Sequence, residues 1–489
     1  MDTTTPAGLP DFSAATSINC DALIVGAGAS GTLLAAQLAR AAPKLRVLVL
    51  DGDHSGGRGA AYRTECDEHL LNVPARGMSG LASEPRHFHQ WLAQRMPGAS
   101  DGTFASRSLY GDYLHELLTE ACASGQVQTR ADWAVAAELV SYQSGQERWR
   151  VRLRSGLRVL TPRVVLAWGN FTPAPPAGCA ALSSPQFMND PWRSDLAECL
   201  TEGIERLQPV LMLGTGLTMY DVALALRQRG HRGPLHALSR HGRLPHTHAT
   251  YAPRDLSAPP PLGSPRAALR WLREEAAHAE QAGGNWRAVI DALRPFNQRL
   301  WQSWDTAQQQ GFMRHLRNLW DVHRHRAAPE IAQRVQALLS TEKLTLHSGR
   351  LVAIQPQRGT TSSTLPLRAV WRAAGGRQVH QSFARVINCT GLSSDYRQLD
   401  HDLIAQLRHA GWLTPDPLGL GIETDSRGQL TQADGRVSPG LYTMGPPRRA
   451  QLWESIAVPE LRVQAAELAQ MLANEALVSS QMTTAAFNG

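Results

Sequence analysis

Residues 21–31 read DALIVGAGASG, and this stretch decides the fold. A run of four apolar residues, typical of a buried strand, leads directly into a G-x-G-x-x-G turn. Apolar residues then recur at helical spacing until Pro43, which ends the helix. Residues 47–50 form a second apolar run, and Asp51 follows it. Strand, glycine turn, helix, strand and acid are the successive parts of a Rossmann-type dinucleotide-binding unit.

Each glycine of this turn has a physical task. Gly26 permits the tight turn, Gly28 lets the backbone approach a pyrophosphate, and Gly31 lets the helix pack close to the strand. The helix N-terminus offers free N–H groups and the positive end of its dipole to phosphates. Asp51 is placed to accept hydrogen bonds from ribose hydroxyls. The predicted cofactor-binding residues of this unit are Gly26, Gly28, Ser30, Gly31, Asp51, Gly52 and Arg58.

A second copy of the unit begins at residues 210–219, VLMLGTGLTM, where Met219 replaces the third glycine. Ser239 follows Gly214 by the same 25 positions that separate Asp51 from Gly26, and Arg240 comes next. An acid at this place would repel a 2′-phosphate, whereas a hydroxyl and a guanidinium would bind one. The second unit therefore predicts NADPH rather than NADH. Its predicted binding residues are Gly214, Gly216, Thr218, Ser239 and Arg240.

Two such turns in one chain are the arrangement of flavoproteins that a nicotinamide reduces, so we expect FAD at the first turn and NADPH at the second. Further strand–glycine junctions occur at Gly391 and Gly445. After them, residues 452–460, LWESIAVPE, predict the start of a helix over 460–472, with Ser455 as its cap. The backbone N–H groups of Ile456 and Ala457 are expected to face the flavin.

The predicted fold is α/β, with two Rossmann-like domains and a helical insertion. The FAD domain is expected over 1–175 and 380–489, the NADPH domain over 185–262 and 341–379, and the insertion over 263–340. In the insertion, Ser264 and Pro265 predict a capped helix start, and Pro295 predicts a break. We expect the insertion to cover the substrate side of the flavin; the alternative is an oligomerisation surface.

Composition limits the class of protein. A chain of 489 residues is too long for one core. Its 43% hydrophobic and 19% charged residues are ordinary for a soluble enzyme. No stretch approaches the roughly 18 apolar residues that cross a bilayer, and residues 1–18 lack the pattern of a secretion signal. We therefore expect a cytoplasmic protein that does not use a membrane.

Charge and cysteine content exclude other classes. The net charge is +7, but Lys44 and Lys343 are the only lysines, and the arginines are interleaved with acids. Because no basic block or stripe is present, nucleic-acid binding is not expected. None of the six cysteines forms a C-x-x-C pair, and no Cys/His cluster has zinc spacing. This argues against a metal site and against a flavin–disulfide reductase.

The chain resembles the bacterial FAD-NAD(P)-binding proteins, a family near the class B flavin monooxygenases. The stretches that carry the resemblance are the two glycine turns, GAAY at 59–62, LNVPA at 71–75 with Met78 and Ser79, WDVHRHR at 320–326, and LWESIAVPE at 452–460. The resemblance implies the FAD and NADPH cofactors. Class B enzymes carry a stretch containing His and Trp before the second turn. Here residues 189–192 read NDPW and keep only the tryptophan, which argues against Baeyer–Villiger chemistry and leaves N- or C-hydroxylation open.

The candidate catalytic residues are Asn72, Arg76 and Trp192. Asn72 and Arg76 lie in the loop that, in such flavoproteins, passes the flavin ring, where they could bind the flavin edge or the substrate. Trp192 is the tryptophan of the altered class B stretch. His323 and His325 are not expected to bind a metal, because two residues apart on a helix the rings point away from each other.

The sequence thus predicts an NADPH-dependent FAD oxidoreductase, with a monooxygenase that uses molecular oxygen to hydroxylate a small polar molecule as the favoured activity. One alternative is a reductase or dehydrogenase that does not oxygenate. Another is a binding protein that keeps the flavoprotein fold without catalysis. The oligomeric state, including a homo-oligomer, is left open.

Overall fold

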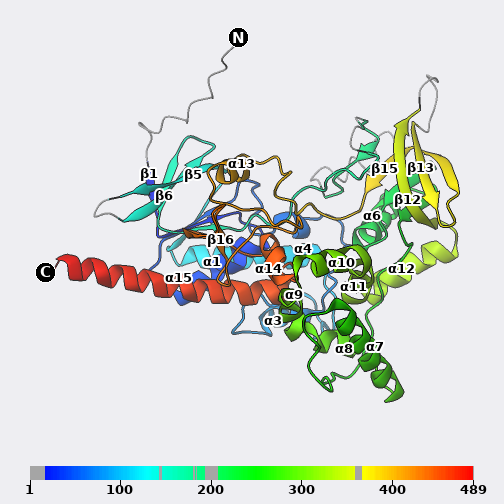
Figure 1. Cartoon of the computed structure of the whole chain (residues 1–489), viewed down its shortest axis with the longest axis horizontal. Coiled ribbons are helices and arrows are strands. Elements are labelled where there is room, and N and C mark those ends of the chain that lie inside the picture. The colour runs from blue at the N-terminus through cyan, green and yellow to red at the C-terminus, as the bar shows by residue number, and fades with distance from the viewer. Residues whose placement is uncertain are drawn as a thin grey trace, which may run out of the picture.

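The structure is a computed structural model that describes residues 17–142, 146–179, 182, 184–192, 207–357 and 366–487, with side chains up to residue 478. Figure 1 shows two sheet-containing halves side by side, with the long helix α15 (Val458–Phe487) running beneath the first half. A group of short helices lies beneath the second half. Trp192 is described, whereas the segment 193–206 after it lies outside the described residues.

The first sheet is built around the N-terminal glycine turn. Its six strands have the order β16-β17-β8-β2-β3-β4, and all neighbours are parallel except the edge pair β16–β17. The predicted strands at the turn are confirmed, since β2 and β3 are buried along their whole length. The strands are β2 (Ala22–Val25), β3 (Val47–Leu50), β4 (Val127–Arg130), β8 (Val164–Leu166), β16 (Gln429–Thr431) and β17 (Val437–Thr443).

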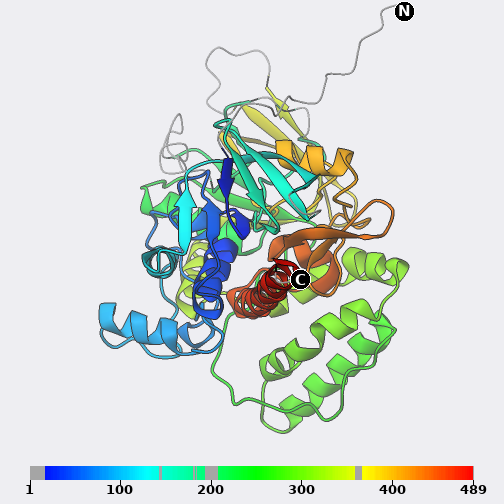
Figure 2. The same cartoon turned by 90° about the vertical axis from the view of Figure 1, so that its left-hand side faces the viewer.

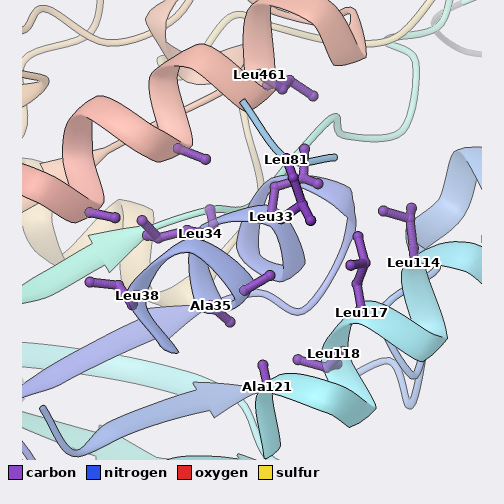
Figure 3. Packing of buried hydrophobic residues seen from close by; sticks show 14 of the residues in the cluster. Leu33, Leu34, Ala35, Leu38, Leu81, Leu114, Leu117, Leu118, Ala121 and Leu461 are labelled. Carbon is purple, nitrogen blue, oxygen red and sulfur yellow. The ribbon is translucent and has the colours of Figure 1, made fainter. Parts of the chain in front are cut away.

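Helix α1 (Ala29–Ala41) is the centre of the first core. Figure 3 shows its Leu33, Leu34 and Leu38 between α15, which contributes Leu461, and α4 (Arg107–Ala123). The helix is apolar almost all round, as a helix buried on several sides must be. Residues from the two ends of the chain therefore fix the position of the first glycine turn.

The opposite face of this sheet is covered by a small sheet of order β1-β7-β6-β5 and by α13 (Asp402–His409). Trp149 and Val151 of this layer pack against Leu23 and Leu48 of β2 and β3. The half is therefore a three-layer structure. The strands of the small sheet are β1 (Ser17–Asn19), β5 (Ala134–Ser141), β6 (Glu147–Leu153) and β7 (Arg158–Thr161).

The second sheet has seven strands in the order β14-β13-β12-β11-β10-β15-β9. The long strand β12 (Leu344–Pro356) pairs in parallel with β11 and then in antiparallel fashion with β13. The other strands are β9 (Phe187–Met188), β10 (Val210–Leu213), β11 (Leu235–Ser239), β13 (Leu367–Ala373), β14 (Gln378–Phe383) and β15 (Arg385–Asn388). The second Rossmann unit is confirmed, because β10, α6 (Leu217–Gln228) and β11 follow one another as predicted.

The structure assigns two segments to domains other than those expected from the sequence. Strand β15 pairs in parallel with β10, so the chain returns to the first domain after Asn388 and not at residue 380. Helix α12 (Pro329–Ser340), expected in the insertion, packs on α6 and joins the core of the second domain. Periodicity could not reveal either assignment, because each depends on a partner distant in sequence.

The insertion consists of five helices, which form a lobe of their own in Figure 2. Ser264 caps the first, accepting from the N–H of Ala267, and Pro295 lies in the break between the second and the third, as predicted. The helices are α7 (Pro265–Gln281), α8 (Trp286–Ala292), α9 (Asn297–Gln302), α10 (Thr306–His315) and α11 (Arg317–Arg324). Of the helices described, none combines the length and the apolar content that a bilayer crossing requires.

One buried and two half-buried histidines predict sensitivity to acid. Burial lowers the pKa values of His231, His236 and His248 from 6.5 to about 4. Between these values the unfolded chain binds protons that the folded chain does not, so stability falls as the pH is lowered through this window. We expect the urea midpoint, followed by tryptophan fluorescence, to decrease from pH 6.5 to about 4. The decrease should be smaller in His231→Gln than in the wild type, whereas His409→Gln, at an exposed position, should behave as the wild type does. Equal decreases in the two variants would contradict the assignment.

Candidate functional site

One cleft, of about 590 Å³, collects residues from both domains and from the insertion. We call it the interdomain cleft. Sequence-predicted site residues that line it are Asn72, Gly214, Gly216, Thr218, Ser239, Arg240, Gly391 and Ile456. They come from five separate stretches of sequence. The structure therefore brings the predicted NADPH residues together with the loop that was expected to pass the flavin.

The second glycine turn forms one wall of the interdomain cleft. Gly214 has a φ of +112°, and a Cβ there would lie 2.5 Å from the carbonyl oxygen of Cys389, so only glycine fits. Gly216 precedes the first residue of α6, and a Cβ at this position would meet nothing within 4 Å. The open space at a helix N-terminus fits a pyrophosphate. Met219, which replaces the third glycine, is fully buried in the core of the second domain.

The predicted residues Ser239 and Arg240 lie at the end of β11 and at the start of the loop that follows it. The Ser239 hydroxyl accepts from the N–H of Gly242 at 3.0 Å and lies 2.9 Å from the hydroxyl oxygen of Thr215. Ser239 thus organises its own loop. Arg240 is exposed at the edge of the interdomain cleft, and Arg243 lies beside it, donating to Asn318 at 3.2 Å. The cationic side chains of this loop are the groups that fit a 2′-phosphate.

Arg449 is a cleft residue that the sequence analysis missed. Burial, and then the charge of Arg317, lower the pKa of its guanidinium to about 10. Its Nε is buried and has no hydrogen-bond partner within the described residues. A charged group in this condition favours an anionic ligand, because a counter-charge would offset its desolvation. The signal in the sequence was its place shortly after the strand–glycine junction at Gly445.

At the first glycine turn, packing explains two of the three glycines. Gly26 has a φ of +109°, and a Cβ there would lie 2.6 Å from the carbonyl oxygen of Ala167. A Cβ on Gly31 would lie 1.9 Å from the carbonyl oxygen of Gly26. Gly28 precedes the first residue of α1, and a Cβ there would meet only Gly59, at 3.5 Å. The approach to the helix N-terminus stays free of side chains, as a pyrophosphate requires.

Asp51 has a further role that the motif did not indicate. Its Oδ1 accepts from the N–H and the hydroxyl of Ser55, each at 2.9 Å, and its Oδ2 accepts from the N–H of Gly56 at 2.8 Å. The carboxylate therefore holds the following loop against the glycine turn. Because each carboxylate oxygen accepts two hydrogen bonds, Oδ2 keeps capacity for a ribose hydroxyl.

Three other residues predicted for the first site have defined neighbours. A Cβ on Gly52 would overlap the indole of Trp133, at 2.3 Å, so Gly52 provides a close packing surface. Arg58 pairs with Asp112 at 2.9 Å. Ser30 lies against Gly445: a Cβ added to Gly445 would lie 2.5 Å from the hydroxyl oxygen of Ser30. The junction at Gly445 thus closes on the start of α1.

The expected helix cap at Ser455 is wrong. Helix α15 begins at Val458, and the carbonyl oxygen of Ala457 accepts from the N–H groups of Glu460 and Leu461. Ser455 is fully buried, and its hydroxyl has no partner among the described residues. Ile456 is 41% exposed and lines the interdomain cleft. The cap lies two residues later than predicted, although the segment does reach the cleft.

Of the three catalytic candidates, the interdomain cleft contains Asn72, whose carbonyl oxygen lies 3.0 Å from Nε2 of His248. Arg76 is exposed and lies outside the cleft lining. Trp192 also lies outside it and packs on His69, with ring centres 5.7 Å apart, and on Arg107. These contacts favour a structural role for Trp192.

Arg107 and its partner join the two domains. Its guanidinium pairs with buried Asp221 of α6 at 2.8 Å, and Nε2 of His69 lies 3.1 Å from the Asp221 carbonyl oxygen. His323 lies on α11, and His325 follows the last residue of that helix. Within the described residues, no group of three or more His, Cys, Asp and Glu side chains is arranged to hold a metal ion.

A comparison with protein families matches residues 23–171 to the family described as FAD-NAD(P)-binding. The first domain is thus similar to that family over this segment. It contains the whole first glycine turn, Asp51 and the loop with Asn72. The resemblance, and with it FAD and a nicotinamide as cofactors, is therefore confirmed at the level of the family. No curated protein matches the sequence.

Solved structures of similar fold cover nearly the whole chain. L-lysine 6-monooxygenase from Pseudomonas syringae is 18% identical with a TM-score of 0.65, over 93% of this chain and 99% of that one. Ornithine hydroxylase from Pseudomonas aeruginosa is 15% identical with a TM-score of 0.62, over 94% and 99%. Ornithine N-hydroxylase from Kutzneria sp. 744 is 13% identical with a TM-score of 0.63, over 94% and 100%. At these identities the likeness shows the fold, and it confirms the predicted α/β class.

The two glycine turns allow a reciprocal test. Gly28→Val should cover the N-terminus of α1 and yield protein without FAD, whereas Gly216→Val should keep FAD and lose reduction by NADPH. Both glycines have negative φ, so valine adds little backbone strain. FAD released on denaturation and the rate of flavin bleaching by NADPH are the two measurements. Full FAD in Gly28→Val would show that the first site is misassigned.

Proposed function

We propose that this protein is an NADPH-dependent FAD monooxygenase whose reaction takes place in the interdomain cleft. The observation that carries the proposal is the meeting of Asn72 and Ile456, from the first domain, with Gly214 and Gly216 in one cleft. Bound FAD would supply the redox chemistry, taking two electrons from NADPH and passing them to oxygen.

The residues of the chain have separate tasks in this proposal. Gly216 and the N-terminus of α6 receive the pyrophosphate of NADPH, and Arg240 reads its 2′-phosphate. Arg449 lines the cleft, and its buried Nε, which has no hydrogen-bond partner among the described residues, is a donor for an anion there. Arg317, Asp321 and other residues of α11 close the side of the cleft that faces the insertion. A closed site keeps water away from reactive species, which oxygen chemistry requires.

Cysteine placement argues against the disulfide-reductase alternative. A bacillithiol disulfide reductase from Staphylococcus aureus has a related fold, at 11% identity and a TM-score of 0.53 over 94% of this chain and 99% of that one. Among the described residues, Cys389 is the cysteine that lines the interdomain cleft, and burial raises the pKa of its thiol strongly. A protonated, buried thiol is a poor nucleophile for disulfide exchange.

Oxygen use distinguishes the proposed monooxygenase from a reductase. Anaerobic NADPH should bleach the bound flavin, and oxygen should then restore the oxidised spectrum with incorporation of one oxygen atom into the substrate. The measurement is stopped-flow absorbance together with isotope-labelled oxygen. Reoxidation that never labels any product, across substrates that stimulate NADPH oxidation, would favour the reductase.

Cofactor preference tests the role of Arg240. Loss of one charge-assisted contact should weaken NADPH binding about 10- to 150-fold in Arg240→Ala and leave NADH unaffected. Arg232→Ala is the matched control, because Arg232 is also an exposed arginine of the second domain but lies outside the cleft lining. Steady-state KM values for both nucleotides provide the measurement. An equal loss for NADPH and NADH would show that Arg240 does not contact the 2′-phosphate.

A further inference from the structure

The helical insertion encloses a second pocket, of about 390 Å³, which we call the tryptophan pocket. It lies between α7, α8, α9, α10 and α11, and Trp453 closes it from the first domain. Its indole side chains are those of Trp271, Trp286, Trp301, Trp304, Trp320 and Trp453. This size and this apolar lining are typical of small-molecule sites.

Polar groups in the wall are few, and several lack partners. Asn297 is 6% exposed, and its Nδ2 has no hydrogen-bond partner within the described residues. The same holds for the indole N–H groups of Trp304 and Trp320. The charged residues that border the pocket, Arg273 and Glu280, are exposed on α7. Buried donors without acceptors favour a neutral ligand that brings an acceptor of its own.

A small void lies between the tryptophan pocket and the interdomain cleft and shares residues with each of them. This void of about 20 Å³ is bounded by Trp320 and Trp453, which also line the tryptophan pocket. The same void is bounded by His325, Arg449 and Ile456, which also line the interdomain cleft. A molecule held among the indoles thus lies near the proposed reaction site. The void between the two is lined by Trp320 and Trp453 and by the Arg324–Glu454 ion pair.

Trp453 is held at this boundary in an uncommon backbone conformation. Its φ is +61°, in the left-handed region that a bulky residue rarely adopts. The ring stacks on Trp301 with centres 4.8 Å apart, and the next residue, Glu454, accepts two hydrogen bonds from Arg324. Strain of this kind persists where surrounding contacts enforce it, and it is frequent at functional sites.

We propose that the tryptophan pocket binds the substrate, and that the substrate is a neutral, largely apolar molecule with a hydrogen-bond acceptor such as a carbonyl group. This proposed substrate differs from the small polar molecule expected from the sequence, because charged or amino-rich molecules would lose their hydration without gaining partners there. Its use in catalysis rests on the proposed monooxygenase function, whereas binding to the pocket does not.

Two neighbouring alanines on α7 provide a matched pair of variants. Ala276 lines the tryptophan pocket, and Ala277 is exposed on the same helix. Ala276→Trp should fill the pocket, whereas Ala277→Trp introduces the same residue, with the same helix propensity, on the solvent side. Both variants should keep their FAD, because neither alanine lies near the glycine turns.

The experiment is calorimetric titration of the FAD-loaded protein with acetophenone, benzylacetone and cyclohexanone, which are neutral ketones, and with L-ornithine as the polar comparison. At least one ketone should bind to the wild type and to Ala277→Trp, and about tenfold or more weakly to Ala276→Trp. Butylbenzene, which lacks an acceptor, should bind more weakly than benzylacetone. The ketone that binds should also stimulate NADPH oxidation in the wild type and in Ala277→Trp.

Binding of L-ornithine with no binding of any ketone would overturn the proposal. Unchanged ketone binding in Ala276→Trp would also overturn it. A change in the mass of the assembly in solution in that variant alone would overturn it too, because it would identify the pocket as an interface between copies of the chain. If ketones bind as expected but NADPH never bleaches the flavin, the pocket stands and the proposed function fails.

Discussion

Two contacts between a glycine and the end of a neighbouring strand determine the architecture. Because Gly26 has no side chain, the carbonyl oxygen of Ala167 can pack directly against it. The carbonyl oxygen of Cys389 packs in the same way against Gly214. In both domains the carbonyl belongs to the residue directly after a strand, β8 or β15, that runs parallel to the strand leading into the turn. The segments that follow it, with Gly169 in one case and Gly391 in the other, both line the interdomain cleft. The same packing constraint therefore aims two helix N-termini and builds the cleft wall.

Buried ion pairs then hold the parts in register. Arg107 pairs with Asp221 between the two domains, and Arg324 of the insertion pairs with Glu454 just before α15. Burial opposes both charges of the second pair, yet Glu454 raises the pKa of Arg324, and Arg324 lowers that of Glu454. Separating such partners would leave a charge unpaired in a desolvated place. The insertion is therefore tied to the residues that line the cleft.

Local patterns in the sequence were sufficient for the Rossmann units, since strand, turn and helix follow within a few dozen residues and depend on neighbours. They were not sufficient where a side chain finds its partner far away. The motif could not show that Asp51 also holds its own loop, or that Trp192 packs on Arg107. The prediction of a cap at Ser455 was wrong because the chain makes a turn at Trp453, just before Ser455. This turn depends on the stacking of Trp453 on Trp301, which is some 150 positions away in the sequence. Arg449 became visible only once burial was known.

The two cavities differ in the chemistry that they can hold, and this difference follows from their walls. The interdomain cleft presents backbone N–H groups, Arg240 and Arg449, which suit phosphates and other anions. The tryptophan pocket presents indoles and few charges. Such a separation suits a reaction that consumes a charged dinucleotide and must exclude water. The apolar pocket supplies a low-dielectric wall, and the cleft keeps the charged groups that bind the dinucleotide. Trp320 and Trp453 border the void between the two cavities together with the Arg324–Glu454 ion pair, so the strained backbone of Trp453 lies where the two environments meet.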